Sequence, residues 1–302
     1  MLDACIIGAP KCGTSSLFRW LTAHPRISGP KEQKELFFFM DASHPLAKDP
    51  NVHTSTLAAY ETLFPSNEKL RVEGTTHYLY QKTARRHLSQ MDSRPLIIAV
   101  VRDPARRVWS SFQYTRNNLA RMDPSLSFDQ YVEWALQDEL EKIADHISHP
   151  GSAYVLARDV KYGCYVNFLR RWRDAVGQGR MFVVSFDSVV SDSRNLCRHI
   201  ASLLEVDESL YRDFDFRAKN TTYETVSQSV QTWARRIGRW MPRNPFREWL
   251  KKVYIQVATR EDSSPHTEEH RRALQKLRDH YSPYNEQLSD EFDIEVSSWT
   301  QS

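Results

Sequence analysis

The sequence predicts an α/β fold in which a central parallel β-sheet carries helices on both faces. Short apolar runs typical of buried strands alternate with longer segments in which apolar residues recur at helical spacing. A glycine-containing turn joins the first apolar run directly to the first helical segment. The length of 302 residues, with 40% hydrophobic and 26% charged residues, suits a soluble enzyme of one large domain or two small ones.

The expected strands are the most apolar short runs, and each is followed by a helical segment. The strands are Ala4–Gly8, Arg71–Glu73, Leu96–Val101 and Met181–Phe186. The helices that follow them are Thr14–His24, Thr83–Met91, Pro104–Asn117 and Ser191–Leu204. Two more helices are expected over Gly163–Val176 and His266–Leu288, the second broken near Pro283.

Three segments fall outside this alternation. Residues 41–55 and 145–159 are rich in turn-forming residues and are expected as loops. Residues 231–252 form a basic, aromatic stretch with seven Arg or Lys against the single acid Glu248. This stretch is either a solvated pair of helices or a lid or docking face for an anionic acceptor or its carrier.

Charge and cysteine usage exclude several classes of protein. A formal charge of +3 does not indicate a general polyanion binder, so no nucleic-acid partner is expected. The four cysteines form no CxxC pair, which argues against a zinc site, and no metal is expected. No apolar run approaches the roughly 20 residues of a membrane span. With no export signal either, we expect a cytoplasmic protein.

The turn between Gly8 and Gly13 has the features of a P-loop-like phosphate site. A strand enters it and a helix leaves it, which directs backbone N–H groups toward an anion. A Walker A sequence has its lysine directly after the second glycine, whereas here Thr14 stands in that place. The lysine is Lys11, inside the loop, where it would reach the bridging oxygen of a short anhydride rather than a γ-phosphate.

A second anion site is expected after the strand Leu96–Val101. Arg102 follows the strand directly, and Pro104 suits the first turn of a helix. Ser110 comes eight residues after Arg102. An arginine at a strand end and a serine on the next helix together suit a phosphate group.

These two elements, taken together, resemble those of sulfotransferases that use 3′-phosphoadenosine-5′-phosphosulfate (PAPS). Pro10–Leu17 is similar to the family's PKxGTTxL loop, which binds the 5′-phosphosulfate. Arg102–Phe112 is similar to its RxPxxRxxSxY element, which binds the 3′-phosphate. The resemblance implies that the donor is bound by Lys11, Cys12, Gly13, Thr14, Ser15, Ser16, Arg102 and Ser110.

The expected acceptor side resembles the heparan sulfate sulfotransferases and their bacterial relatives. Lys34–Phe39 is similar to the KExHFF element, which implies that Glu35 is the general base. Glu73–Leu79 is similar to the EKTPxYx element, except that Gly74 stands where that family has an active-site lysine. His77 is a candidate to compensate, as a base or as a donor to the sulfuryl group.

The resemblance therefore implies a single sulfotransferase domain over residues 1–302 that transfers SO₃ from PAPS to a hydroxyl and releases 3′-phosphoadenosine-5′-phosphate (PAP). The acceptor stays open between a saccharide, a small metabolite of a bacterial enzyme, and an acyl chain on a carrier. Two alternatives remain, a P-loop nucleotide kinase or NTPase and a non-catalytic PAP-binding protein.

Overall fold

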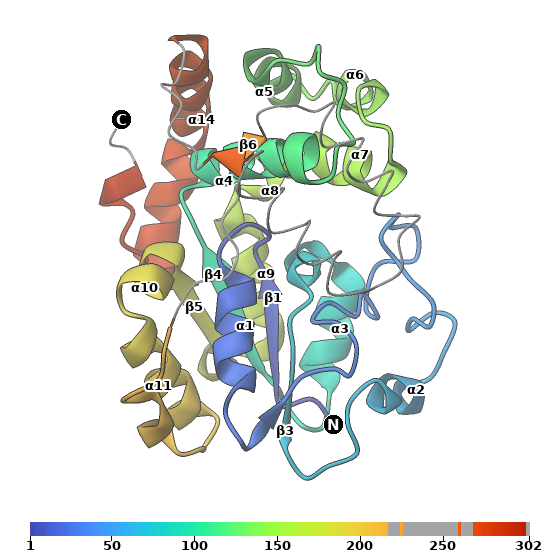
Figure 1. Ribbon diagram of the computed structural model, residues 1–302, viewed down its shortest axis with the longest axis vertical. Coiled ribbons are helices and arrows are strands. Elements are labelled where there is room, and N and C mark those ends of the chain that lie inside the picture. The colour runs from blue at the N-terminus through green and yellow to red at the C-terminus, as the bar shows by residue number, and fades with distance from the viewer. Residues whose placement is uncertain (217–223, 226–258, 261–267, 300–302) are drawn as a thin grey trace. The chain divides into compact units, whose positions relative to one another are not determined.

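The computed structural model describes residues 1–216, 224–225, 259–260 and 268–299 (Figure 1). The chain forms two compact units. The first consists of Met1–Arg107, Lys161–Asn220 and Arg278–Ser302, and the second of Val108–Val160 and Thr221–Leu277. The basic stretch 231–252 lies outside the described residues. None of the helices in the described part of the chain has the length and apolarity needed to cross a bilayer.

A five-stranded parallel sheet forms the centre of the first unit, in the order β2-β3-β1-β4-β5. This sheet and the helices that flank it confirm the α/β class. Every residue of β1 is buried, as are five of the six residues of β4, because both strands lie inside the sheet and are covered by helices. The strands are β1 (Ala4–Gly8), β2 (Ile27–Ser28), β3 (Leu70–Glu73), β4 (Leu96–Val101) and β5 (Met181–Ser185).

The helices of the first unit pack against the sheet in groups. Helix α1 (Thr14–Thr22) contacts β1, β2 and β3 and packs on α11 (Ser193–Leu203). Helix α3 (Lys82–Gln90) packs on α9 (Tyr165–Val176), which also contacts β5. Figure 1 shows α1 running beside β1 after the short loop that joins them. The remaining elements are α2 (Leu57–Thr62), η1 (Thr76–Tyr80), α8 (Asp159–Tyr162, shared with the second unit), η3 (Gln178–Arg180), α10 (Phe186–Ser191), η4 (Glu208–Tyr211) and η5 (Ser297–Trp299).

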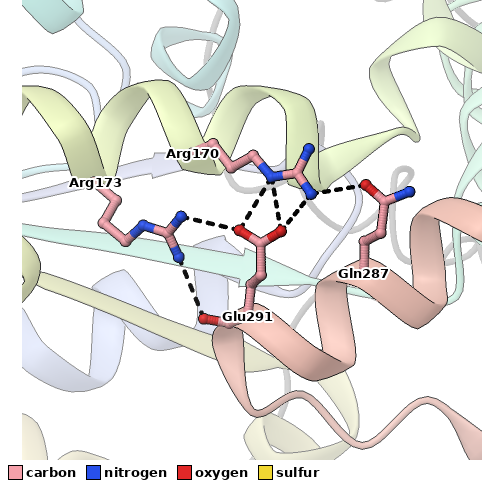
Figure 2. A network of polar contacts seen from close by, with 4 residues as sticks. All are labelled: Arg170, Arg173, Gln287 and Glu291. Carbon is pink, nitrogen blue, oxygen red and sulfur yellow. Dashed lines mark hydrogen bonds and ion pairs between the residues drawn. The ribbon is translucent and has the colours of Figure 1, made fainter.

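An arginine pair ties α9 to the C-terminal part of α14 (Glu268–Phe292), which belongs to the first unit from Arg278 onward, as Figure 2 shows. The guanidinium of Arg170 donates to both carboxylate oxygens of Glu291 and to Gln287 Oε1, the last at 2.7 Å. Arg173 Nη2 donates to the same carboxylate at 2.9 Å. The two guanidinium groups lower the pKa of Glu291 to about 2, with Arg170 as the larger cause. The last turns of α14 are thereby fixed against α9.

The second unit is helical apart from one short ladder in its described part. Aromatic rings from three of its segments pack together, with Trp109 4.7 Å from Phe128 and 4.1 Å from His270 between ring centroids. Lys276 on α14 pairs with Asp129 on α5 at 3.2 Å. Its elements are α4 (Pro104–Gln113, shared with the first unit), η2 (Tyr114–Asn118), α5 (Phe128–Leu136), α6 (Leu140–Asp145), α7 (Pro150–Ala157), and the antiparallel pair β6 (Glu224–Thr225) and β7 (Thr259–Arg260).

Two expectations about local structure are wrong. The expected loop 145–159 contains α7, because His149 Nδ1 accepts the N–H of Ser152 and Pro150 occupies the first helical turn, where its missing N–H costs nothing. The expected break near Pro283 does not occur, since α14 continues through this residue to Phe292. Residues 41–55 contain no helix or strand.

Candidate active site

The loop between β1 and α1 is held against the neighbouring strand. The N–H of Ala9 donates to the carbonyl of Val100 on β4 at 2.7 Å. Lys11 and Gly13 have positive φ angles of 67° and 78°, whereas the intervening Cys12 does not. A turn in which residues of opposite hand alternate directs successive N–H groups to one side, which makes a concave site for an anion.

Gly13 is required at the start of α1 for a steric reason. A Cβ at this position would lie 2.9 Å from the ring of Phe186, in addition to the strain that a side chain meets at positive φ. Gly13 is also the N-cap of the helix and has no side chain to accept the first amides. The start of α1 is therefore suited to bind an anionic ligand, and the N–H of Ser16 also donates to the carbonyl of Gly13 at 3.0 Å.

Arg102 follows β4 and lies beside this loop. Its Nη1 donates to the carbonyl of Lys11 at 3.4 Å, and its guanidinium lies 4.6 Å from the centre of the Phe186 ring. Phe186 thus contacts the guanidinium of Arg102 and also leaves no room for a side chain at Gly13. One partly buried aromatic ring therefore supports both the loop and the arginine.

The start of α4 is held by Asp103. Its Oδ1 accepts the N–H of Ala105 at 2.8 Å and of Arg106 at 3.3 Å, the arrangement of an N-cap residue in front of Pro104. Ser110 lies farther along α4, among residues assigned to the second unit. The pairing of Ser110 with Arg102 therefore stays a prediction.

Glu35 is connected to the start of α1, just after the loop from β1, through its neighbour Lys34. Lys34 Nζ lies 3.4 Å from Glu35 Oε1 and donates to Thr14 Oγ1 at 3.1 Å and Ser15 Oγ at 3.4 Å. Thr76 Oγ1 donates to the same Glu35 oxygen at 2.9 Å. A carboxylate expected to act as a base is thus joined by one ammonium group to two hydroxyls at the start of α1.

A buried network beneath Glu35 fixes the backbone on which it stands. Thr75 Oγ1 accepts the N–H groups of Leu36 at 2.8 Å and Phe37 at 3.2 Å and donates to Glu73 Oε1 at 2.5 Å. Tyr60 donates to the other oxygen of Glu73 at 2.6 Å. Burial raises the pKa of Glu73 to about 6, although its hydrogen bonds oppose this. The segment that carries Glu35 is therefore held by the end of β3.

His77 lies in a different set of contacts. Its largely buried ring is 6.4 Å from that of Phe37, 6.2 Å from that of His44 and 6.5 Å from that of Tyr80, between centroids. The exposed Lys48 places its ammonium 4.8 Å from the Phe37 ring centre. These residues form an aromatic and basic cluster next to the segment that carries Glu35.

The structure brings together many of the residues predicted from the sequence and adds others. Lys11 to Ser16 form the loop and the first turn of α1, Arg102 contacts the loop, and Glu35 is linked to it. Sequence reasoning assigned no role to Lys34, Thr76 or Phe186. Their roles depend on contacts between segments that are distant in the chain. The spacing of apolar residues along the sequence does not predict such contacts.

Comparison with known proteins identifies related sequences. A profile of the family described as "Sulfotransferase domain" matches residues 2–279. Mouse heparan sulfate glucosamine 3-O-sulfotransferase 3B1 is 27% identical over 204 residues, which is 67% of this chain and 45% of that protein. The bifunctional heparan sulfate N-deacetylase/N-sulfotransferase 1 of Caenorhabditis elegans is 24% identical over 210 residues, which is 68% of this chain and 22% of that protein. The chain spans less than half of the length of either relative.

A solved structure shares the fold. The crystal structure of a sulfotransferase from Alicyclobacillus acidocaldarius superposes with a TM-score of 0.64 at 20% identity, over 100% of this chain and 99% of that one. At this level of identity the likeness concerns the fold.

Proposed function

The chain belongs to the sulfotransferase domain family, and from this membership we propose that it moves the sulfuryl group of PAPS to an acceptor hydroxyl and releases PAP. One feature of the site carries the proposal, namely the convergence of three groups on the loop at residues 11–15. These groups are the N-terminus of α1, the guanidinium of Arg102, and Glu35 joined through Lys34. A sulfuryl transferase that uses PAPS needs a binding site for the phosphosulfate group, a second site for the 3′-phosphate, and a base for the acceptor hydroxyl.

The loop fits the phosphosulfate end of the donor. Left-handed residues at positions 11 and 13 and the uncapped N-terminus of α1 supply N–H groups for phosphate oxygens. We assign Lys11, with Cys12, Gly13, Thr14, Ser15 and Ser16, to this end. We assign Arg102 and Ser110 to the 3′-phosphate, the group that distinguishes PAPS from ATP.

The proposed reaction is an in-line displacement at sulfur. A bond forms between the acceptor oxygen and sulfur, while the bond from sulfur to the bridging oxygen breaks and leaves its electron pair on the phosphate. Glu35 takes the proton of the acceptor hydroxyl, and Lys11 and the loop amides stabilise the charge that grows on the leaving oxygen. The products are a sulfate ester, PAP and one proton.

Glu35 is the better supported of the two candidate bases. Its contacts with Lys34 and Thr76 both involve Oε1, so these two groups hold the carboxylate by that oxygen. We propose that the other oxygen, Oε2, accepts the proton. The contacts of His77 include the rings of Phe37, His44 and Tyr80. We propose that His77 shapes the acceptor pocket, and Glu35→Gln against His77→Ala tests this assignment.

For the acceptor we propose a saccharide hydroxyl first. The relatives named above are heparan sulfate enzymes, and the cluster of Phe37, His77 and Tyr80 offers aromatic faces on which a sugar ring can stack. A small metabolite or a carrier-bound acyl chain is the second choice. A cytoplasmic, bacterial setting belongs to the same proposal, and its cytoplasmic part is supported by four cysteines that are all buried thiols.

The decisive experiment uses PAPS labelled on its sulfuryl group and a panel of acceptors that includes heparan sulfate oligosaccharides. Wild type should transfer the label, and Lys11→Ala should lower the rate by roughly 10³-fold with unchanged folding. The exposed Lys69→Ala is the matched control and should keep full activity. Full activity of Lys11→Ala would contradict the assignment of the loop.

Ligand binding separates the alternatives. PAP should raise the melting temperature, whereas ATP with magnesium should not, because only PAP offers a 3′-phosphate to Arg102. The reverse result would favour a nucleotide kinase or NTPase. Tight PAP binding without transfer to any acceptor would indicate a non-catalytic PAP-binding protein.

A further inference from the structure

We infer that Lys34 is a positioning residue of the reaction, and that Gly74 leaves the space its side chain needs to reach the donor loop. The inference rests on the proposed sulfuryl transfer. It adds a second lysine to a site for which the sequence indicated only Lys11.

The first observation is the course of the Lys34 side chain. A Cβ on Gly74 would lie 2.9 Å from Cγ, 3.1 Å from Cδ and 3.2 Å from Cε of Lys34. The backbones also meet, because the N–H of Gly74 donates to the carbonyl of Lys34 at 3.2 Å. The aliphatic part of Lys34 therefore packs directly on the backbone at Gly74, where no side chain is present. Any larger residue there would have to displace it.

The second observation is the place where the side chain ends. Lys34 Nζ donates to the hydroxyls of Thr14 and Ser15 and pairs with Glu35, and only 16% of the side chain is exposed. Burial lowers the pKa of Lys34, and the carboxylate of Glu35 opposes that shift. A surface lysine that pairs with its neighbour stays hydrated and avoids the free-energy cost of desolvation. The burial of Lys34 therefore indicates a specific position in the site rather than an incidental ion pair.

An ammonium group is only a donor, so each hydroxyl that accepts from Lys34 must direct its own proton elsewhere. The protons of Thr14 and Ser15 are then available to oxygens of an anionic ligand on the loop. On its other side the same ammonium group holds Oε1 of Glu35. Lys34 thus orients the donor-binding hydroxyls and the base together, and sets the spacing between the two reactants.

The test compares three variants with wild type by kcat, by PAP affinity and by melting temperature. Lys34→Met keeps the length of the side chain but not the charge, and should lower kcat by about 10²-fold while the Kd of PAP changes less than about threefold. Gly74→Ala carries no functional group, yet should lower kcat by roughly 10-fold because its Cβ displaces the Lys34 stem. Lys31→Met, an exposed lysine that donates to the carbonyl of Thr62, should leave kcat unchanged.

The outcomes separate this inference from the proposed function. A kcat within threefold of wild type in Lys34→Met would overturn the inference alone. A fall in kcat accompanied by an equal loss of PAP affinity, or by a fall in melting temperature, would also overturn it, since Lys34 would then be structural. If Lys34→Met does not fold, an unchanged kcat in Gly74→Ala would overturn the inference instead. A wild type that transfers no sulfuryl group would overturn the proposed function itself.

Discussion

Thr76 donates a hydrogen bond of 2.9 Å from Oγ1 to Oε1 of Glu35. Thr76 follows β3 and begins η1, whereas Glu35 belongs to a segment about 40 residues earlier, so this bond connects two segments that are distant in the sequence. Thr75, the preceding residue, fixes the same segment through the N–H groups of Leu36 and Phe37. Thr76 therefore orients the Glu35 carboxylate together with Lys34, while Thr75 fixes the backbone that follows Glu35.

Removal of the Thr76 hydroxyl should impair catalysis more than substrate binding. In Thr76→Val the carboxylate of Glu35 loses one of the groups that orient it, and kcat should fall by about 10-fold with little change in the KM of PAPS. Thr76→Ser keeps the hydroxyl and should stay near the wild-type rate. Steady-state kinetics of both variants test this, and an unchanged kcat in Thr76→Val would show that the bond does not orient the base.

Arg102 should select nucleotides that carry a 3′-phosphate. In Arg102→Ala the loss of charge-assisted hydrogen bonds should weaken PAP binding by roughly 10- to 100-fold. Adenosine 5′-phosphate has no 3′-phosphate, so its affinity should change much less. Calorimetric titration gives the Kd of each nucleotide and hence the ratio between them. Arg102→Lys should show a ratio between those of wild type and Arg102→Ala. Equal losses for both would mean that Arg102 acts only by holding the carbonyl of Lys11.

Asp103 should contribute to stability as the cap of α4 rather than to catalysis. Asp103→Ala leaves the N–H groups of Ala105 and Arg106 without their acceptor, which should cost about 1 kcal/mol in the free energy of unfolding. Asp103→Asn keeps an acceptor oxygen and should lose less. Denaturant unfolding at neutral pH measures both, and equal losses in the two variants would show that the charge of Asp103, not the cap, is what stabilises.

The strands β1 and β4 could be predicted from the sequence because they lie inside a parallel sheet. A strand that is buried on both faces is a continuous apolar run, as β1 and β4 are. The two residues of β2 are too few for such a pattern. Helix α7 was missed because Pro150 and Gly151, considered alone, indicate a turn. When His149 caps the helix, however, a proline in the first turn is compatible with the start of a helix.

The site could be predicted only where its residues follow one another in the chain. The loop from Lys11 to Ser16 is contiguous, so its glycine, lysine and hydroxyl residues are visible together. The function of Lys34 depends instead on the absence of a side chain at Gly74, some 40 residues later, and on the hydroxyl of Thr14. Contacts of this kind arise from the packing of the strand ends against each other. No local pattern in one sequence reports them.

Glu73 should make stability depend on pH in the mildly acidic range. Burial raises its pKa from the ordinary value of 4.5 to about 6 in the folded protein, so the folded state holds this proton more tightly than the unfolded chain does. The contribution of Glu73 is therefore most favourable below pH 4.5 and declines as the pH rises to about 6, by about 2 kcal/mol in total. Glu73→Gln cannot ionise and should lack this decline.

Denaturant unfolding of wild type and Glu73→Gln between pH 4 and pH 7 tests the prediction, because all other titrating groups are common to both proteins. The difference in unfolding free energy should shift in favour of the variant as the pH rises through this window, and stay constant above it. The exposed Glu68→Gln serves as the control and should follow wild type at every pH. A constant difference across the range would mean that Glu73 keeps its ordinary pKa despite burial, held there by the hydrogen bonds from Tyr60 and Thr75.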